Sequence, residues 1–131
     1  NYIQNCIAYT GTHDNDTAFG WYASAAEHEK DYFRRYLSSD GSDVPWKMVR
    51  EVWASVAVYA IAPLQDILGQ DGSKRMNLPG RADGNWGYRF LPGELKADVA
   101  AWLLDLNTMY NRIPEVNRVP SPRPTLKYQD A

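Results

Sequence analysis

The sequence of 131 residues has a single cysteine, only two histidines and no long apolar run. Cys6 has no second cysteine to pair with, so an internal disulfide is excluded and a reducing compartment is favoured. The longest apolar stretch covers residues 52–64 and is interrupted by Ser55, whereas a membrane-spanning helix needs about 20 apolar residues. The first residues show neither the basic nor the apolar region of a secretory signal. We therefore expect a protein of a reducing compartment such as the cytoplasm, with no membrane partner.

A surplus of one charge is also missing. Fourteen Lys and Arg stand against sixteen Asp and Glu, which gives a net charge of -2 and no basic patch for nucleic acid. The hydrophobic share of 44% and the charged share of 23% are typical of a globular protein, and the length fits about one domain. Nucleic acid is therefore not expected among the partners.

Aromatic residues, by contrast, are abundant, at 13% of the chain. About half of them are expected in the core. Others stand beside Gly, Asn and Asp outside the periodic runs, as Trp21, Tyr22, Trp86 and Tyr88 do. Aromatic rings with a polar handle suit sugars, which present apolar C–H faces edged by hydroxyl groups. Loop aromatics of this kind indicate a binding surface.

The spacing of apolar and turn residues predicts five elements. In chain order they are a strand over 3–10, a helix over 24–38, a helix opened by Pro45, a strand over 57–62 and a closing helix over 95–110. The core face of the helix opened by Pro45 is predicted at positions i, i+3, i+4 and i+7, which are Val49, Val52, Trp53 and Val56. Ser24 with Glu27 fits a capping box for the first helix. The run 57–62 is apolar without alternation, which is typical of a strand covered on both faces of a parallel sheet.

This order predicts an α/β fold with two consecutive strand-then-helix units. Ligands of such folds bind at the carboxyl ends of the strands, and the polar loops 11–17 and 65–89 both follow strand ends. A complete (β/α)8 TIM barrel takes eight strands and about 250 residues, so in a barrel this chain would be only the C-terminal part. Residues 115–131, which include three prolines, are expected to form an extended or disordered tail after a segment over 1–114.

Residues 10–17 bring together an imidazole, two carboxylates and a carboxamide. One interpretation is an Asx turn that leads into a helix. A second is a metal site of His13, Asp14 and Asp16, although no further His or Cys cluster completes it and the EF-hand spacing fails at Ala18. A third is a glycan-active site, because a carboxylate stabilises the oxocarbenium transition state of glycosidic bond cleavage.

Three motifs then make the sequence recognisable. They are Tyr9-Thr10-Gly11-Thr12-His13-Asp14-Asn15-Asp16-Thr17, Pro63-Leu64-Gln65-Asp66 with Leu68-Gly69, and Arg75-Met76-Asn77-Leu78-Pro79-Gly80 followed by Gly84-Asn85-Trp86. Together they resemble the amylomaltases, the 4-α-glucanotransferases of glycoside hydrolase family 77. The resemblance runs to about Arg112. Where family members often have a second Trp after Trp86, this chain has the smaller aromatic Tyr88, a difference that concerns packing more than chemistry.

The resemblance implies a retaining transglycosylase on a (β/α)8 barrel that moves α-1,4-glucan segments between maltooligosaccharides without an organic cofactor. Asp14 would be the third catalytic carboxylate, which stabilises the transition state, and His13 would hydrogen-bond the same sugar ring. The substrate-binding positions implied for the loops are Asn15, Asn77, Pro79 and Trp86, with Trp86 supporting the second loop. No metal is expected, and the location that the resemblance implies is the cytoplasm or the plastid stroma.

The resemblance also implies that the nucleophilic Asp and the acid/base Glu lie before Asn1, so the upstream part of the same enzyme is an expected partner and this chain alone is expected to be inactive. Two other functions stay open at this point. One is a non-catalytic glucan-binding module that has the aromatic loops without the chemistry. The other is the metal-dependent hydrolase built on the acidic cluster.

Overall fold

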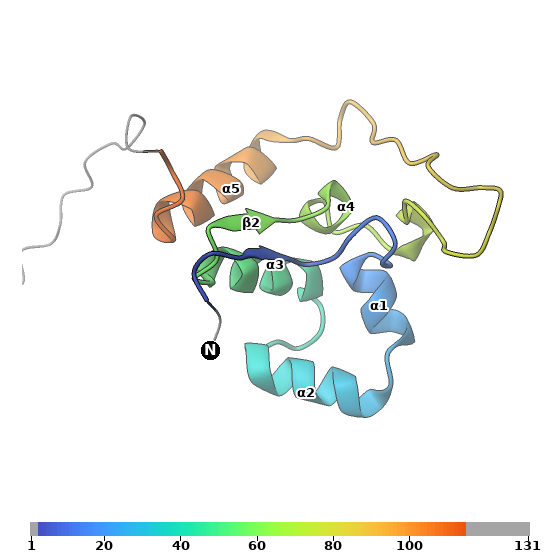
Figure 1. Ribbon diagram of the computed structural model, residues 1–131, viewed down its shortest axis with the longest axis horizontal. Coiled ribbons are helices and arrows are strands. Elements are labelled where there is room, and N and C mark those ends of the chain that lie inside the picture. Colours follow the sequence, from blue (N-terminus) through green and yellow to red (C-terminus); the bar gives the residue numbers. More distant parts are fainter. Residues whose placement is uncertain (1–2, 115–131) are drawn as a thin grey trace, which may run out of the picture.

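The structure, a computed structural model, describes residues 3–114 (Figure 1). In chain order the elements are β1 (Ile7–Tyr9), α1 (Ala18–Ser24), α2 (Glu27–Leu37), α3 (Val44–Ala54), β2 (Tyr59–Ile61), α4 (Leu64–Ile67), the 3₁₀ helix η1 (Gly72–Lys74) and α5 (Ala97–Met109). The predicted tail over 115–131 lies outside the described residues. Within 3–114 no helix is long and apolar enough to cross a membrane.

The two strands pair in parallel, with Ile7 opposite Tyr59 and Tyr9 opposite Ile61. The strand-helix-strand order therefore confirms the predicted α/β class with a parallel sheet. Since parallel strands share one carboxyl edge, the loop after Tyr9 and the segment after Ile61 leave the sheet side by side. This edge places the candidate site.

Helix α3 is the centre of packing, with contacts to both strands and to α1, α4 and α5. Pro45 stands at the start of the helix, where its missing N–H costs nothing. Two buried clusters use opposite stretches of α3. The first joins Val44 to Ala18 of α1 and Phe33 of α2, and the second joins Val49 and Trp53 to Leu106 of α5. The predicted core face of α3 is thus confirmed for Val49 and Trp53.

The predicted helix over 24–38 is in part wrong. The structure has two helices in this region, and Ser24 ends the first one, with its hydroxyl donating to the carbonyls of Gly20 and Trp21. The second begins at Glu27 and is capped by the Glu29 carboxylate, which accepts from the Ala26 N–H at 2.9 Å. The sequence pattern does not predict the short helix α1, because Gly20 lowers the helix propensity of this stretch.

The prediction for the run 57–62 is also wrong in one respect. The strand forms, but Tyr59 is 63% exposed and Ile61 is 52% exposed, because the described sheet has only two strands and helices cover only part of it. Val56, predicted on the core face of the preceding helix, is exposed because the helix ends at Ala54. The region predicted as one long loop contains α4 and η1.

Candidate functional site

The first loop of the site is fixed at both ends by one buried carboxylate. Asp66 of α4 is 2% exposed. It accepts from the Thr10 hydroxyl at 2.6 Å and from the Ala18 N–H at 2.8 Å, so it bridges the end of β1 and the start of α1. Residues 11–17 span the distance between these two anchor points. The parallel pairing of β1 and β2 explains why α4 is near enough to hold them.

Inside the first loop, side chains close short turns of the main chain. The Asn15 carboxamide oxygen accepts from the Thr12 N–H at 2.7 Å and from the Thr12 hydroxyl at 3.0 Å. Thr17 caps α1 by accepting from the Gly20 N–H at 3.1 Å. The loop therefore does lead into a capped helix, but the Asn15 oxygen accepts from a residue three positions earlier rather than two positions later, as an Asx turn requires. The carboxamide oxygen of Asn15 is engaged by the loop itself.

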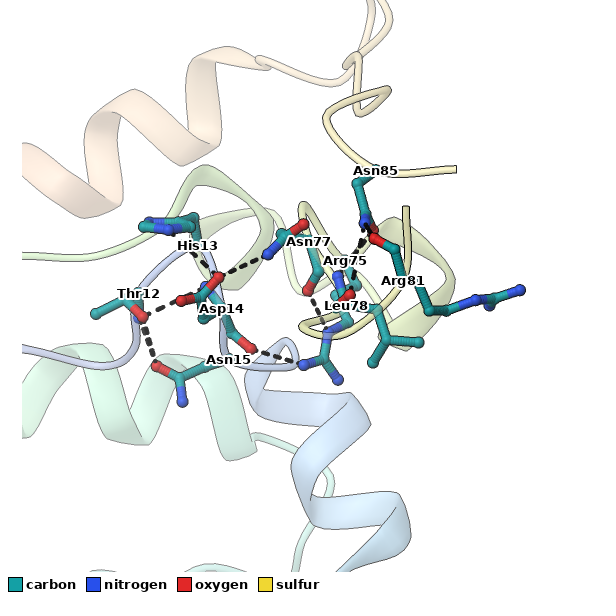
Figure 2. Close-up of polar contacts among 9 residues, drawn as sticks. All are labelled: Thr12, His13, Asp14, Asn15, Arg75, Asn77, Leu78, Arg81 and Asn85. Carbon is teal, nitrogen blue, oxygen red and sulfur yellow. Dashed lines mark hydrogen bonds and ion pairs between the residues drawn. The ribbon is translucent and has the colours of Figure 1, made fainter. Parts of the chain in front are cut away.

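Asp14 lies where the two loops meet (Figure 2). Its Oδ1 accepts from Asn77 Nδ2 at 2.7 Å and lies 3.3 Å from His13 Nε2. The side chains of Asp14 and His13 are 51% and 54% exposed, so both groups are open to a ligand. The two predicted catalytic residues, His13 and Asp14, therefore lie together. The predicted substrate contact Asn77, 63 positions after Asp14 in sequence, binds the same Asp14 oxygen that His13 approaches.

Arg75 joins the same loops through the main chain. Its Nη2 donates to the Asp14 carbonyl at 2.6 Å and its Nε donates to the Asn77 carbonyl at 2.7 Å (Figure 2). Its Nη1 lies 3.7 Å from Asp16 Oδ2. Asp16 is therefore turned toward the arginine, while Asp14 is turned toward Asn77.

The second loop is organised by Asn85, whose oxygen accepts from the Leu78 N–H at 2.8 Å and whose nitrogen donates to the Arg81 carbonyl at 2.8 Å. Pro79 lies exposed within this turn. The main-chain N–H of Trp86 closes the loop by donating to the Met76 carbonyl at 2.8 Å.

The Trp86 ring lies 5.0 Å from the His13 ring, with an angle of 35° between them. The Trp86 side chain is 57% exposed. Within residues 3–114 the link from Trp86 to the second loop is therefore its main-chain hydrogen bond to Met76, while the residue itself is largely exposed. The ring extends the surface beside His13, which leaves one aromatic face available to a ligand.

A pocket of about 510 Å³ lies between the two loops and the ends of both strands. His13, Arg75 and Tyr88 are among its lining residues. Burial is the main cause that raises the pKa of the Tyr88 phenol, and Glu94 adds to it. A phenol is protonated at neutral pH even without such a shift, so this hydroxyl can donate a hydrogen bond. Asp14 and Asn77 do not line this pocket, so the site consists of the pocket together with the half-exposed pair beside it.

The second interpretation of residues 10–17, a metal site, gains no ligand set within the described residues. Among residues 3–114 no group of three or more His, Cys, Asp and Glu side chains is placed to hold a metal ion. Asp16 lies beside Arg75 and Asp14 beside Asn77, so the two carboxylates have different partners.

Sequence reasoning missed four supporting residues, all of which lie inside the motifs it quoted: Thr10, Asp66, Arg75 and Asn85. Their signal was position, since each stands next to or within a loop at a strand end. Nothing in the residue types alone distinguishes an anchor from a ligand contact. The pairing of the loops in space supplies that distinction.

Comparison with known proteins supplies the family. The sequence profile of glycoside hydrolase family 77, described as 4-alpha-glucanotransferase, matches residues 1–95. The chain belongs to this family.

Relatives within the family come from bacteria and plants. The chain is 47% identical over 103 residues to the 4-alpha-glucanotransferase of Thermus thermophilus, which covers 74% of this chain and 21% of that protein. It is 40% identical over 118 residues to the chloroplastic/amyloplastic enzyme of Arabidopsis thaliana, at 86% and 20% coverage. The chain therefore spans about a fifth of the length of the curated relatives it matches.

Among solved structures, the amylomaltase from Streptococcus agalactiae in complex with acarbose superposes with a TM-score of 0.80 at 32% identity. The match covers 84% of this chain and 22% of that one. The family that the motifs resemble is thus confirmed by both sequence and structure.

Proposed function

We propose that this chain is the C-terminal segment of the catalytic (β/α)8 barrel of a 4-α-glucanotransferase, with residues 1–114 in the barrel. The enzyme transfers α-1,4-glucan segments between maltooligosaccharides by a retaining double displacement. Its nucleophile and acid/base lie in the upstream part, and this segment supplies Asp14 and the glucan-binding loops. The relatives are bacterial and plastid enzymes, which supports a cytoplasmic or stromal location.

The observation that carries the proposal is that His13 and Asn77 both lie against Oδ1 of Asp14, whose side chain is half exposed. In a retaining mechanism the sugar becomes an oxocarbenium-like cation, and a fixed carboxylate close to the ring lowers the energy of that state. Asn77 and His13 are hydrogen-bonding groups that sugar hydroxyls can replace on Asp14. The neighbouring Trp86 ring adds an aromatic face of the kind that suits a sugar.

The exposed strands support the barrel part of the proposal. Side chains of both strands stand open, with Ile7 at 55% and Tyr59 at 63% exposure. A two-stranded parallel sheet with apolar residues exposed on it is not stable by itself in water. In a barrel these strands gain neighbours at both edges, and the apolar side chains enter the closed core.

The test uses a chimera in which residues 1–114 replace the matching segment of the Thermus thermophilus enzyme, and it measures glucose release from maltotriose. We expect the chimera to be active. Asp14→Asn keeps the shape but removes the charge, and should reduce kcat about a hundredfold or more. Asp16→Asn is the comparison variant and should lose less, because that carboxylate lies beside Arg75 rather than beside the sugar and acts on the reaction only indirectly. Near-parental turnover by the Asp14→Asn chimera would refute the assignment.

The segment expressed alone provides the second arm. It lacks the groups that the retaining mechanism requires, so it should neither transfer nor hydrolyse glucan, and its open sheet edges should cause self-association. Light scattering and the maltotriose assay check both points. Glucose release by the purified segment would show that the catalytic set is complete within 1–131.

A further inference from the structure

Arg75 holds the main chain of both glucan-facing loops with a single planar group. Its two hydrogen bonds, to the carbonyls of Asp14 and Asn77, are 2.6 and 2.7 Å long. These are the two residues whose side chains also meet, Asn77 Nδ2 donating to Asp14 Oδ1. We propose that Arg75 is a positioning residue of the transfer reaction, which fixes Asp14 relative to Asn77 while substrate is bound. This inference rests on the function proposed above.

The side-chain bond between Asp14 and Asn77 cannot do this alone. A sugar hydroxyl that binds Asp14 Oδ1 competes with the Asn77 amide for the same oxygen. Once that bond is exchanged, the side chain of Asp14, which is 51% exposed, has little packing to hold it. The bonds from Arg75 end on carbonyl oxygens that the sugar does not need. They therefore persist through binding and keep the two loops in register.

Arg75 is itself held in place from two sides. Asp16 Oδ2 lies 3.7 Å from its Nη1. The Asp16 carboxylate is confined between Gly20 of α1 and Gly72 of η1, where an added Cβ would come within 2.3 and 2.9 Å of Asp16 Oδ1. Only glycine leaves room for this close approach. The small residues thus allow a carboxylate to stand beside the arginine.

The second support comes from the buried helix α4. Gln65 is 7% exposed, and its Nε2 donates to the carbonyl of Lys74 at 3.2 Å. Lys74 directly precedes Arg75, so the arginine starts from main chain anchored to the same helix whose Asp66 anchors the first loop. We call Arg75 and its two carbonyl contacts, on Asp14 and Asn77, the Arg75 clamp. The clamp is therefore attached to the buried part of the fold through α4.

Holding two carbonyls at once requires an arginine. Its fork presents several N–H donors in fixed directions, whereas the lysine ammonium is a single point charge on a flexible stem. A lysine at position 75 would keep the charge beside Asp16 but would not reach both carbonyls at once. Arg75→Lys consequently removes the paired hydrogen bonds to the two carbonyls and keeps the positive charge.

The chain offers a matched control in Arg112, which also donates to main-chain carbonyls, among them those of Trp53, Ser55 and Ala57. These carbonyls lie at the end of α3 and before the start of β2, whereas both loops follow the other ends of the strands. In the active chimera we expect Arg75→Lys to lower kcat about 10- to 100-fold, the scale of a small displacement of a catalytic group. KM for maltotriose should change little, and so should the unfolding temperature. Arg112→Lys should do the reverse, lowering the unfolding temperature while kcat at 25 °C stays parental.

A double-mutant cycle gives the second readout. If Arg75 acts through the register of Asp14 and Asn77, its loss should matter less once Asn77→Ala has removed one of the two groups. The combined fall in kcat/KM should therefore be smaller than the product of the single falls. Independent effects, which multiply, would contradict the clamp.

The outcomes are distinguishable. Parental kcat for Arg75→Lys in an active chimera would overturn this inference and leave the proposed function intact. A drop in unfolding temperature as large as that of Arg112→Lys would also overturn it, because Arg75 would then be a stabilising residue only. A folded but inactive unsubstituted chimera would overturn the proposed function, and this inference with it.

Discussion

The loops around Arg75 and the helix end around Arg112 use the same chemistry for different purposes. Each guanidinium donates to carbonyl oxygens of the main chain. The partners of Arg112 all lie between Val52 and Ala57, at and just after the end of α3, where unpaired carbonyls and the helix dipole favour a cation. The partners of Arg75 are 63 positions apart, in two loops.

The difference shows what each clamp stabilises. Arg112 completes the hydrogen bonds of one helix end, next to the cluster of Val49, Trp53 and Leu106, so its loss should weaken the fold. Arg75 connects two segments whose side chains are half exposed, so its loss should disturb their relative position. The same side chain therefore serves stability in one region and alignment in the other.

The largest stability effect is expected at Asp66, which anchors both ends of the first loop. Asp66→Ala removes the acceptor of the Thr10 hydroxyl and of the Ala18 N–H, and each lost bond to a buried charge is worth about 1.5 to 3 kcal/mol. We expect the chimera to lose about 3 kcal/mol or more of unfolding free energy in a denaturant titration. Asp66→Asn retains one acceptor oxygen and should lose less. Equal, small losses for both variants would mean that the first loop does not depend on α4.

The second effect concerns the helix-end clamp. Arg112→Met keeps the length of the side chain and removes its donors. Because the carbonyls it leaves can reach water in part, we expect a loss of about 2 kcal/mol in the same titration, with kcat unchanged. An intact unfolding free energy together with a reduced kcat would reverse the comparison between the two arginines.

The smallest stability effect is expected at Trp86. A buried Trp costs about 3 to 5 kcal/mol when truncated, but this ring is 57% exposed, so Trp86→Ala should cost less than about 1 kcal/mol. Its ring contact with His13 predicts weaker binding of maltooligosaccharides, seen as a higher KM. Trp86→Phe is the conservative control and should keep most of the affinity. A large fall in stability with an unchanged KM would make the ring a packing element.

Much of the fold could be predicted because its signals are local. The apolar spacing of Val49 and Trp53 predicts the central helix, and the run before Pro63 predicts the second strand. Helix α1 was missed because Gly20 breaks the pattern, and the glycine is needed there for the close approach of Asp16. A requirement that comes from a contact between distant segments is not visible in local propensity.

The candidate site, too, could be predicted only in part. The motifs identify His13, Asp14 and Asn77, but not that Asn77 contacts Asp14 directly. That contact depends on the parallel register of β1 and β2, which the sequence does not specify. Arg75 and Asp66 could not be singled out either, since an arginine or aspartate in a loop is usually solvated. Only their carbonyl, hydroxyl and N–H partners identify them as anchors.

The most direct measurement is a crystal structure of the chimera with acarbose, the compound in the complex of the Streptococcus agalactiae amylomaltase. The account predicts that the sugar hydroxyls bind the Asp14 carboxylate in place of Asn77 Nδ2, and that Arg75 still donates to the carbonyls of Asp14 and Asn77. Acarbose bound in the barrel with Asp14 out of hydrogen-bonding reach of every sugar ring would contradict it.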